Sequence, residues 1–273
     1  MQKRILTIQD YSVLGRCSLT VALPIISSLQ IECVGLPTAV LSNHTAFPTF
    51  SFVDLTDHML ESVDKWDGYN NNFDMIYTGY LAKGQVDIVL SIIKKLKREN
   101  TIIFIDPAFG ESGKLYKGFD KEHVDDMKRL VEVSDYLLPN LTEACYLTDT
   151  FYQPEDHELA YSVVDKLLAL GAKNVVLTGV KRENNVGCLL VNKKNQYYYG
   201  TNDLKKKFHG TGDVFSSALA GSILSTDDIT KAIKVAHEFT SLAMQKTIED
   251  NVDGILYGPE FEKAIPFLVD QFK

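Results

Sequence analysis

The sequence predicts an α/β protein with a mostly parallel β-sheet covered by helices on both faces. Short runs rich in Ile, Val and Leu alternate with longer segments of helical periodicity, as expected of strands joined by crossover helices. The short runs are mostly rich in Ile, Val or Leu, which is typical of strands buried on both faces. The 273 residues, 45% of them hydrophobic, suffice for a sizeable core. Because no Pro-, Gly- or Ser-rich linker or repeat divides the chain, a single domain spanning residues 1–273 is predicted.

The strands and helices can be placed in order along the chain. Strands are expected at residues 4–8, 31–36, 75–77, 102–105, 136–138 and 175–177. Apolar residues recur at spacings of three and four over residues 86–96, 159–167 and 229–239, which predicts helices that each have one apolar face. Two strand-like runs within residues 186–199 flank a polar turn and predict an antiparallel hairpin. The sheet is therefore expected to end in antiparallel strands.

Composition excludes several classes of protein. A net charge of −8 disfavours a nucleic-acid-binding surface, which requires clustered positive charge. The four cysteines (Cys17, Cys33, Cys145 and Cys188) form no C-x-x-C pair, so neither a zinc site nor a disulfide framework is predicted, and a reducing compartment fits. No run of eighteen apolar residues and no targeting signal is present. We therefore expect a cytoplasmic protein without a membrane span.

Ligands of an open α/β sheet bind beyond the carboxyl ends of its strands. Polar residues follow the predicted strands at five places, namely residues 9–12, 43–45, 78–80, 106–111 and 140–143. Polar groups collect at this edge in any such fold, so these positions alone do not identify a function.

The most informative segment comes near the end of the chain. Gly210 and Gly212 precede a helical stretch, and the free N–H groups of a helix N-terminus can bind an anion such as a phosphate. Asp213 lies in the first turn, where it could either complement the helix dipole or act chemically. Small residues follow and would let this helix pack close to the sheet: Ser216, Ser217, Ala218, Ala220 and Gly221.

This segment resembles the Gly-Ala/Thr-Gly-Asp signature of the ribokinase superfamily, and a closer resemblance to pyridoxal kinases covers essentially the whole chain. The resemblance implies a three-layer αβα sandwich and ATP-dependent phosphorylation of the 5′-hydroxymethyl group of pyridoxal, pyridoxine or pyridoxamine. It implies that Asp213 is the general base and that Gly210, Thr211 and Gly212 form an anion hole. An alcohol is a weak acid, so we expect late proton acceptance rather than prior deprotonation.

Three further motifs carry the resemblance on the vitamer side. Ser12 follows the first predicted strand, where the family uses a serine toward the pyridine ring, although a turn serine is an alternative. Ser42-Asn43-His44-Thr45 is similar to the family segment whose Thr contacts the substrate, while His44 could equally be structural. Thr78-Gly79-Tyr80 resembles a family motif in which Tyr lies near the vitamer. These motifs imply vitamer contacts at Ser12, Thr45 and Tyr80.

Other motifs concern the nucleotide and its metal. Asp106-Pro107 with Glu111 resembles an Asp-Pro-x-x-Gly-Asp segment, from which Glu111 departs by its longer side chain. Asn140 and Glu143 resemble the family's Pro-Asn-x-x-Glu, but the same spacing suits a capping box. The resemblance implies ATP contacts at Asp106, Asn140, Glu143, Thr178, Thr211 and Gly212. It also implies Mg²⁺ held with the help of Glu143, Asp106 and Glu111, and a requirement for a monovalent cation stays open.

Two alternatives remain. Hydroxymethylpyrimidine kinases share the fold and chemistry, but their turn usually carries Cys where this chain has Asp213. A non-catalytic ligand-binding relative is a second alternative, against which the retained Asp213, Asn140 and Glu143 argue. No Gly-Gly-rich N-terminal segment typical of sugar kinases is present. The family resemblance implies a homodimer.

Overall fold

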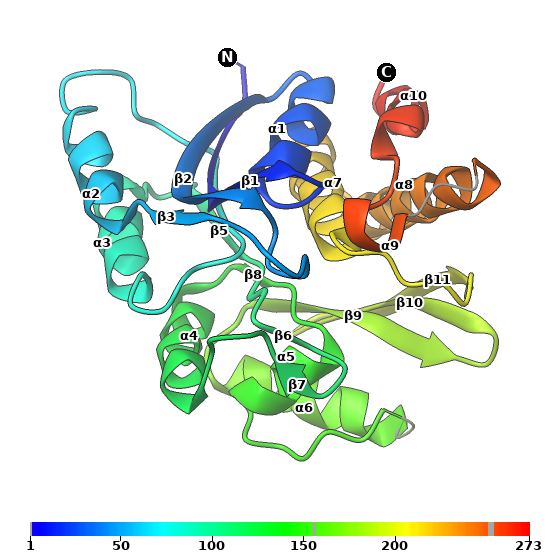
Figure 1. Ribbon diagram of the computed structural model, residues 1–273. Helices are drawn as coiled ribbons and strands as arrows, with labels where there is room; N and C mark the ends of the chain where they lie inside the picture. Colours follow the sequence, from blue (N-terminus) through cyan, green and yellow to red (C-terminus); the bar gives the residue numbers. More distant parts are fainter. Residues whose placement is uncertain (1, 155–156, 251–253) are drawn as a thin grey trace.

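The chain folds as a three-layer α/β sandwich. The computed structural model describes residues 2–154, 157–250 and 254–273. Within them a nine-stranded sheet has the order β11-β10-β9-β8-β5-β4-β1-β2-β3, and helices cover both of its faces (Figure 1). The predicted fold class is therefore confirmed. No helix in these described ranges is long and apolar enough to cross a membrane.

The strands of the main sheet are β1 (Arg4–Leu14), β2 (Glu32–Asn43), β3 (Phe52–Asp54), β4 (Met75–Thr78), β5 (Ile102–Ile105), β8 (Tyr136–Leu137), β9 (Asn174–Arg182), β10 (Asn185–Asn192) and β11 (Gln196–Asn202). A separate small hairpin pairs β6 (Gly110–Glu111) with β7 (Lys114–Leu115). The helices are α1 (Leu19–Ser28), α2 (Thr56–Asp64), α3 (Val86–Leu96), α4 (Lys121–Val133), α5 (Leu141–Leu147), α6 (His157–Ala169), α7 (Thr211–Ser225), α8 (Ile229–Glu249), α9 (Gly254–Tyr257), α10 (Ile265–Asp270) and the short 3₁₀ helix η1 (Phe261–Lys263).

The middle of the sheet is parallel and its ends are antiparallel. Strands β2, β1, β4, β5, β8 and β9 pair in parallel. The hairpin β10–β11 extends the sheet antiparallel to β9, as the sequence predicts. At the other end β3 pairs antiparallel with β2, and this three-residue strand was not predicted.

Two hydrophobic cores form because successive strand residues point to opposite faces of the sheet. Ile5, Met75 and Phe104 pack with α1, α7 and α8, whereas Leu6, Ile76 and Ile103 pack against the layer from α2 to α6. Each fully buried Ile or Leu side chain contributes about 1.5–3 kcal/mol. The sheet is thus buried on both faces, and α7 is held firmly against one of them.

Strand β1 is longer than the sequence predicts. We expected it to end at Ile8, with Gln9 to Ser12 beyond the strand, but it runs to Leu14. Beyond Ile8, which pairs with Thr78 of β4, the strand continues only beside β2, with a bulge between Gln9 and Tyr11. The prediction failed because the buried polar residues here end the apolar run without ending the strand. For the same reason β2 continues to Asn43 rather than ending at Leu36.

Close packing between α7 and α1 depends on a glycine. A Cβ atom on Gly221 would lie 2.6 Å from Cδ1 of Leu29, which follows α1. Because α7 carries the Gly-Thr-Gly-Asp turn at its other end, this contact helps to set the position of that turn.

We predict that Gly221→Val lowers the free energy of unfolding by about 1–3 kcal/mol, because the added methyl groups overpack the contact with Leu29. Chemical denaturation measures the loss. Leu29→Ala in the same chain should relieve the clash, so the double variant should lose less than the sum of the two single losses. Additive losses would show that Leu29 is not the group displaced.

Candidate active site

The turn that opens α7 has the geometry of an anion-binding site. Gly210 precedes the helix with φ of 74°, and a Cβ atom there would lie 2.0 Å from the carbonyl oxygen of Arg16. Only glycine tolerates both this dihedral angle and this approach. No side chain caps the helix, and Gly212 is exposed with open space beside it. The first N–H groups of α7 are therefore free to bind an anion.

Asp213 does not cap the helix that it opens, since the N-cap position belongs to Gly210 and no side-chain bond is made there. Its carboxylate is half-buried and faces two other carboxylates, those of Asp106 and Asp10. Burial, followed by these two negative charges, raises the pKa of Asp213 to about 8, and the backbone N–H of Ser18 partly opposes the shift. Such a carboxylate binds a proton more readily than an ordinary aspartate, as a general base requires.

Asp106 follows β5 and lies beside α7. Burial raises its pKa, while the Ser216 hydroxyl and the backbone N–H of Ala108 act in the opposite direction. Ser216 is itself bound to two neighbours: its Oγ lies 2.7 Å from the Tyr77 hydroxyl and donates to the Gly212 carbonyl oxygen at 2.8 Å. This buried network joins the end of β5 to the first turn of α7.

Glu143 is used structurally. Its Oε2 accepts from the backbone N–H of Asn140 at 2.9 Å, and its Oε1 accepts from Phe109 at 2.9 Å and from Gly110 at 3.3 Å. Asn140 Oδ1 in turn accepts from the Glu143 N–H at 3.1 Å, which completes the capping box of α5. The capping alternative is thus confirmed, and Glu143 also holds the loop after β5. Burial and the charge of Asp106 raise its pKa.

The three residues expected near Mg²⁺ do not form a closed cage. Glu111 is exposed and pairs with Lys207 at 3.6 Å, and Glu143 is engaged as described. In the ranges that the structure describes, no three His, Cys, Asp or Glu side chains gather to hold a metal ion. Asp106 differs, because its carboxylate is half-buried beside two neutral donors, the Ser216 hydroxyl and the Ala108 N–H. Its oxygens suit a divalent cation that is held mainly by phosphate oxygens and water.

The vitamer-side residues gather around the end of β1. Ser12 is buried within the strand, and its hydroxyl donates to Asp10 Oδ2 at 2.8 Å. Tyr80 follows β4, with its ring centroid 5.5 Å from that of Phe119, and its pKa is raised to about 12 by burial and by the charge of Asp10. The structure therefore brings Ser12 and Tyr80 to one place, although the Ser12 hydroxyl is committed to Asp10.

The position of Thr45 is set by contacts of the preceding residue, His44. The ring of His44 stacks on that of His209 with centroids 3.8 Å apart, and His209 immediately precedes Gly210. The Nε2 atom of His44 lies 2.6 Å from the carbonyl oxygen of Leu256. Burial, together with the neighbouring His44, lowers the pKa of His209 to about 4, so the two rings stack as neutral groups near pH 7. The segment that carries Thr45 is thereby held beside the Gly210–Gly212 turn.

Thr178 lies where β9 meets the end of β8. Its N–H donates to the carbonyl oxygen of Pro139 at 2.9 Å, and an isolated parallel bridge joins it to Asn140. Gly179 follows with φ of 70° and open space beside it. Thr178 and Asn140 thus form one short edge facing outward beyond the sheet.

Four residues near the site were missed in the sequence: Asp10, Ser18, Tyr116 and His209. Asp10 interrupts an apolar strand, and a charged residue inside such a run was the available signal. Tyr116 is half-buried, and burial followed by the charges of Glu143 and Glu111 raises its pKa. His209 directly precedes Gly210, so its position beside the turn could have been read from the sequence, whereas only the fold brings Ser18 and Tyr116 to this edge.

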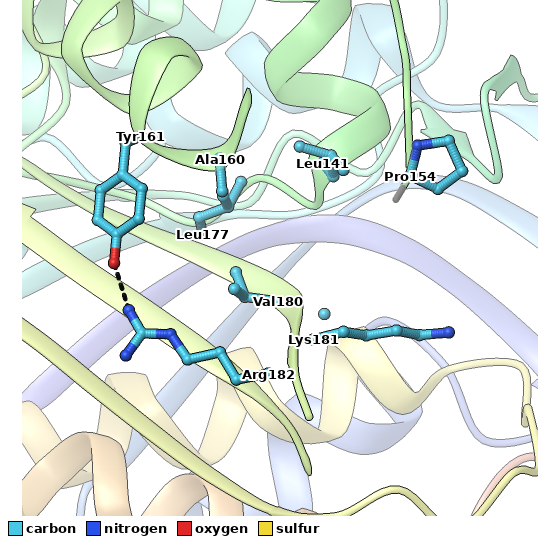
Figure 2. A pocket seen from close by; sticks show the side chains of 9 residues that line it. Leu141, Pro154, Ala160, Tyr161, Leu177, Val180, Lys181 and Arg182 are labelled. Carbon is cyan, nitrogen blue, oxygen red and sulfur yellow. Dashed lines mark hydrogen bonds between the residues drawn. The ribbon is translucent and has the colours of Figure 1, made fainter. Parts of the chain in front are cut away.

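A small cavity is lined by Leu141 and Gly179, which adjoin Asn140 and Thr178, and by none of the carboxylates described above. Figure 2 shows it between α6 and β9, with a volume of about 50 Å³. Arg182 lines it, donates to the Tyr161 hydroxyl and lies 4.0 Å from the centroid of the Tyr198 ring. This volume is far below the roughly 300–1,000 Å³ of ordinary ligand pockets. The carboxylate edge remains the candidate active site.

Fold and site together define a kinase of the ribokinase-like class. The family model for phosphomethylpyrimidine kinase matches residues 56–254. A pyridoxal kinase of Dictyostelium discoideum is 30% identical over 262 residues, which cover 87% of this chain and 85% of that one. The chain belongs to the pyridoxal kinase family.

Two solved structures agree with this assignment. A Bacteroides thetaiotaomicron protein assigned to the phosphomethylpyrimidine kinases, in a crystal form with pyridoxal, is 35% identical with a TM-score of 0.92, covering 98% of this chain and 96% of that one. The pyridoxal kinase of Lactobacillus plantarum is 27% identical with a TM-score of 0.90, covering 99% and 98%.

The hydrogen bonds of Glu143 predict the effect of Glu143→Gln. An amide cannot accept all three backbone N–H groups, so the free energy of unfolding should fall by about 1–3 kcal/mol. Differential scanning calorimetry measures the change. The Mg²⁺ concentration at half-maximal rate should stay near that of the unaltered protein. An unchanged melting temperature with a several-fold higher Mg²⁺ requirement would assign Glu143 to the metal instead.

Proposed function

We propose that this protein transfers the γ-phosphoryl group of ATP to the 5′-hydroxymethyl group of a B6 vitamer, giving the 5′-phosphate and ADP. One observation carries the proposal: Asp213 is a half-buried carboxylate that does not cap α7 and lies at the open N-terminus of that helix. The names of the relatives and the pyridoxal in the Bacteroides thetaiotaomicron crystal form support the choice of substrate.

In this transfer the Asp213 side chain acts on the acceptor hydroxyl, and the backbone of the turn acts on the phosphoryl group. Asp213 orients the acceptor hydroxyl and takes its proton as the oxygen bonds to the γ-phosphorus. The bond from that phosphorus to the β,γ-bridging oxygen breaks, and ADP leaves with the electron pair. The free N–H groups at Thr211 and Gly212 lie where they can stabilise the negative charge on the transferring group. Gly210 permits the backbone to reach that position.

The nucleotide is proposed to lie along the edge formed by Asn140, Thr178 and the turn, with Asp106 toward its phosphates. Mg²⁺, when bound, supplies neutralisation of phosphate charge. Asp106 fits this role because its carboxylate is half-buried and its neighbours, the Ser216 hydroxyl and the Ala108 N–H, are neutral. Glu111 stands at the outer end of the same loop and contributes at most through water.

The vitamer is proposed to lie between the end of β1 and the start of α7, in contact with Tyr80 and Thr45. A flat aromatic ring needs an apolar or aromatic wall and a few hydrogen bonds, and the Tyr80 ring can serve as the wall. Ser12 acts here by holding Asp10. A sugar would call for a denser set of polar side chains.

We also infer that residues 1–273 act as one domain and that the protein is a homodimer. Exposed apolar side chains on β1 and β3, the two strands that flank β2, support an interface there, with Val13 62% and Val53 57% exposed. Large exposed hydrophobic residues that gather on one surface often mark interaction sites.

Hydroxymethylpyrimidine phosphorylation is the second candidate function. The matching family model, which is described as phosphomethylpyrimidine kinase, favours it. Hydroxymethylpyrimidine kinases usually carry Cys where this chain has Asp213, and several relatives are pyridoxal kinases. Hydroxymethylpyrimidine phosphorylation is therefore the less supported function.

We predict that Asp213→Asn lowers kcat about 10²- to 10⁴-fold, because the shape is kept while the proton acceptor is lost. Steady-state kinetics with pyridoxal measure the loss, and the nucleotide affinity should change little. A folded Asp213→Asn protein with near-normal turnover would refute the role of the base.

We predict that every B6 vitamer has a higher kcat/KM than hydroxymethylpyrimidine, ribose or fructose. Thr45→Val should lower vitamer kcat/KM roughly tenfold or more by removing one hydrogen bond, whereas Thr45→Ser should keep most of it. Competition assays that separate the phosphorylated products test both statements. Hydroxymethylpyrimidine or a sugar outperforming all vitamers would contradict the proposed function.

A further inference from the structure

Lys207 joins the two segments that flank the proposed position of the ATP phosphates. It lies shortly before Gly210 in the sequence. Its ammonium group donates to the Ser112 hydroxyl at 2.9 Å and pairs with Glu111 at 3.6 Å. Both partners belong to the β6–β7 hairpin, which follows β5. The contact therefore connects this hairpin to the segment that leads into the Gly210–Gly212 turn.

The β6–β7 hairpin is held firmly against the start of α5. The Gly110 carbonyl oxygen accepts from the Asn140 side chain at 2.8 Å. The Gly113 N–H donates to the Thr142 hydroxyl at 2.9 Å. Between them Ser112 adopts φ of 53°, in the left-handed region that few non-glycine residues occupy. The Ser112 hydroxyl is therefore carried by a turn whose backbone is fixed on both sides.

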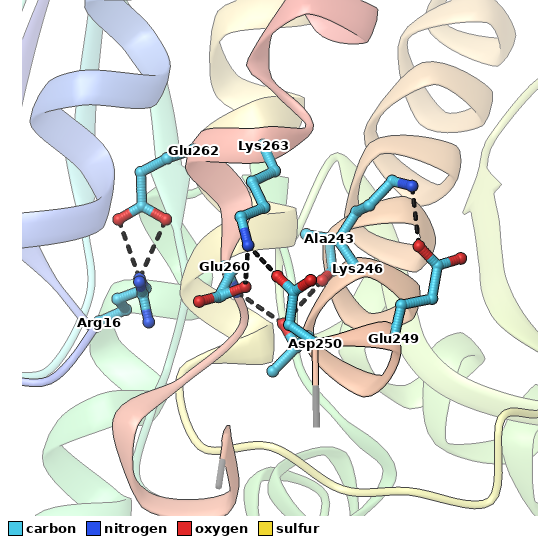
Figure 3. A network of polar contacts seen from close by, with 9 residues as sticks. Arg16, Ala243, Lys246, Glu249, Asp250, Glu260, Glu262 and Lys263 are labelled. Carbon is cyan, nitrogen blue, oxygen red and sulfur yellow. Dashed lines mark hydrogen bonds and ion pairs between the residues drawn. The ribbon is translucent and has the colours of Figure 1, made fainter. Parts of the chain in front are cut away.

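The loop between β1 and α1 anchors the Gly210–Gly212 turn. The Arg16 carbonyl oxygen lies against Gly210, and the Arg16 guanidinium pairs with Glu262 at 2.9 Å. Figure 3 shows this pair beside the ion pairs that join η1 to the end of α8. The turn is thus held in place from the side of η1, opposite in the chain to the contact of Lys207.

The backbone of Lys207 is held next to the turn, while its side chain remains exposed. Phe208, which follows it, is buried, and its carbonyl oxygen accepts from the Thr211 hydroxyl at 2.8 Å. On the other side of Lys207, the Lys205 N–H donates to Asp203 Oδ1 at 2.8 Å. These contacts leave the Lys207 side chain as the mobile part of a fixed segment.

Chain connections and contacts together form a ring that borders the proposed phosphate position. One side of the ring is the loop from Asp106 to the β6–β7 hairpin, and the other is the start of α7. The two sides meet where the Ser216 hydroxyl lies beside the Asp106 carboxylate, and again where Lys207 meets Ser112. Lys207 therefore places a positive charge at the rim of this ring.

A triphosphate is a better partner for this ammonium group than Glu111. The side chains of Lys207 and Glu111 are 80% and 57% exposed, and ion pairs so open to water contribute little to stability. Phosphate oxygens carry more negative charge than one carboxylate and accept strong charge-assisted hydrogen bonds. A lysine stem is flexible, so the ammonium group can change partners without a shift of the backbone.

We propose that Lys207 is a nucleotide-binding residue: when ATP enters, its ammonium group leaves Glu111 and Ser112 and binds the terminal phosphates. This inference rests on the proposed function, in which ATP lies along the edge beside the Gly210–Gly212 turn. Before ATP arrives, the hairpin holds the lysine at the rim of the site, so less side-chain freedom is lost on binding. The ammonium group adds a full positive charge to the partial charges of the helix N-terminus.

The test compares the two partners of one ion pair. Lys207→Met and Glu111→Gln both remove the pair, but only Lys207→Met removes a ligand of phosphate. Isothermal titration calorimetry of the full protein with ATP in EDTA gives the dissociation constant without any metal-mediated effect of Glu111. Lys207→Met should raise this constant about 5- to 20-fold. Glu111→Gln should not raise it, because this change frees Lys207 and removes a negative charge that repels phosphate.

Two further variants serve as controls. Lys207→Arg keeps the charge and should keep the ATP dissociation constant within about threefold of that of the unaltered protein. Lys206→Met removes the same charge from the neighbouring exposed residue and should change the constant less than about twofold. In turnover assays with Mg²⁺, Lys207→Met should raise KM for ATP and leave KM for pyridoxal in place, a split that a general loss of structure does not produce.

Equal rises in the ATP dissociation constant of Lys207→Met and Glu111→Gln would overturn the inference, since the pair would then act only as a structural tie. An unchanged constant in Lys207→Met would overturn it too. So would an equal effect of Lys206→Met, which would indicate a general attraction of anions. Absence of B6 phosphorylation by the unaltered protein would contradict the proposed function instead, and the ATP dissociation constants would still decide the role of Lys207.

Discussion

Four buried or half-buried carboxylates at one edge of the sheet, each with a pKa raised chiefly by burial, impose the main constraint on this structure. The buried negative charge of each carboxylate is stabilised by different groups. Glu143 accepts hydrogen bonds from three backbone N–H groups, and Asp10 accepts them from two serine hydroxyls. The Ser216 hydroxyl and the N–H of Ala108 lower the pKa of Asp106. For Asp213, the backbone N–H of Ser18 is the one group among the described residues that opposes the rise in pKa. The least compensated carboxylate is the one that stands at the open helix N-terminus, where proton acceptance and phosphate binding are both possible.

The fold places these groups together by simple means. Asp106 and Thr178 lie at the same edge because the strands that carry them are parallel. The small residues of α7 let that helix pack close to its neighbours. Gly210 lies against the Arg16 carbonyl oxygen, so the loop after β1 packs against the Gly210–Gly212 turn. The stacked rings of His44 and His209 join the end of β2 to the same turn. The ends of β1 and β2 and the N-terminus of α7 therefore meet at one place through backbone contacts and side-chain packing.

Much of the fold was predictable because its pattern is local. The parallel strands, the final hairpin and the glycine turn each have a period or motif of their own. The length of β1 was not predictable, since Gln9 and Asp10 are polar and yet buried. Ser12 illustrates the limit at the site: its position suggested a vitamer contact, but its hydroxyl is bound to Asp10, a partner two residues away on the same strand. The spacing of Asn140 and Glu143 was compatible with two roles, and only the bonds from Phe109 and Gly110 favour the structural one.

The central claim is that Asp213 and the N-terminus of α7 converge on the hydroxymethyl group of a B6 vitamer. A crystal structure of the protein with pyridoxine and a non-hydrolysable ATP analogue tests it most directly. The account predicts the hydroxymethyl oxygen within about 3 Å of the Asp213 carboxylate, with the γ-phosphate against the N–H groups of the turn. A vitamer whose hydroxymethyl group points away from Asp213, or a γ-phosphate held elsewhere than at the Gly210–Gly212 turn, would contradict it.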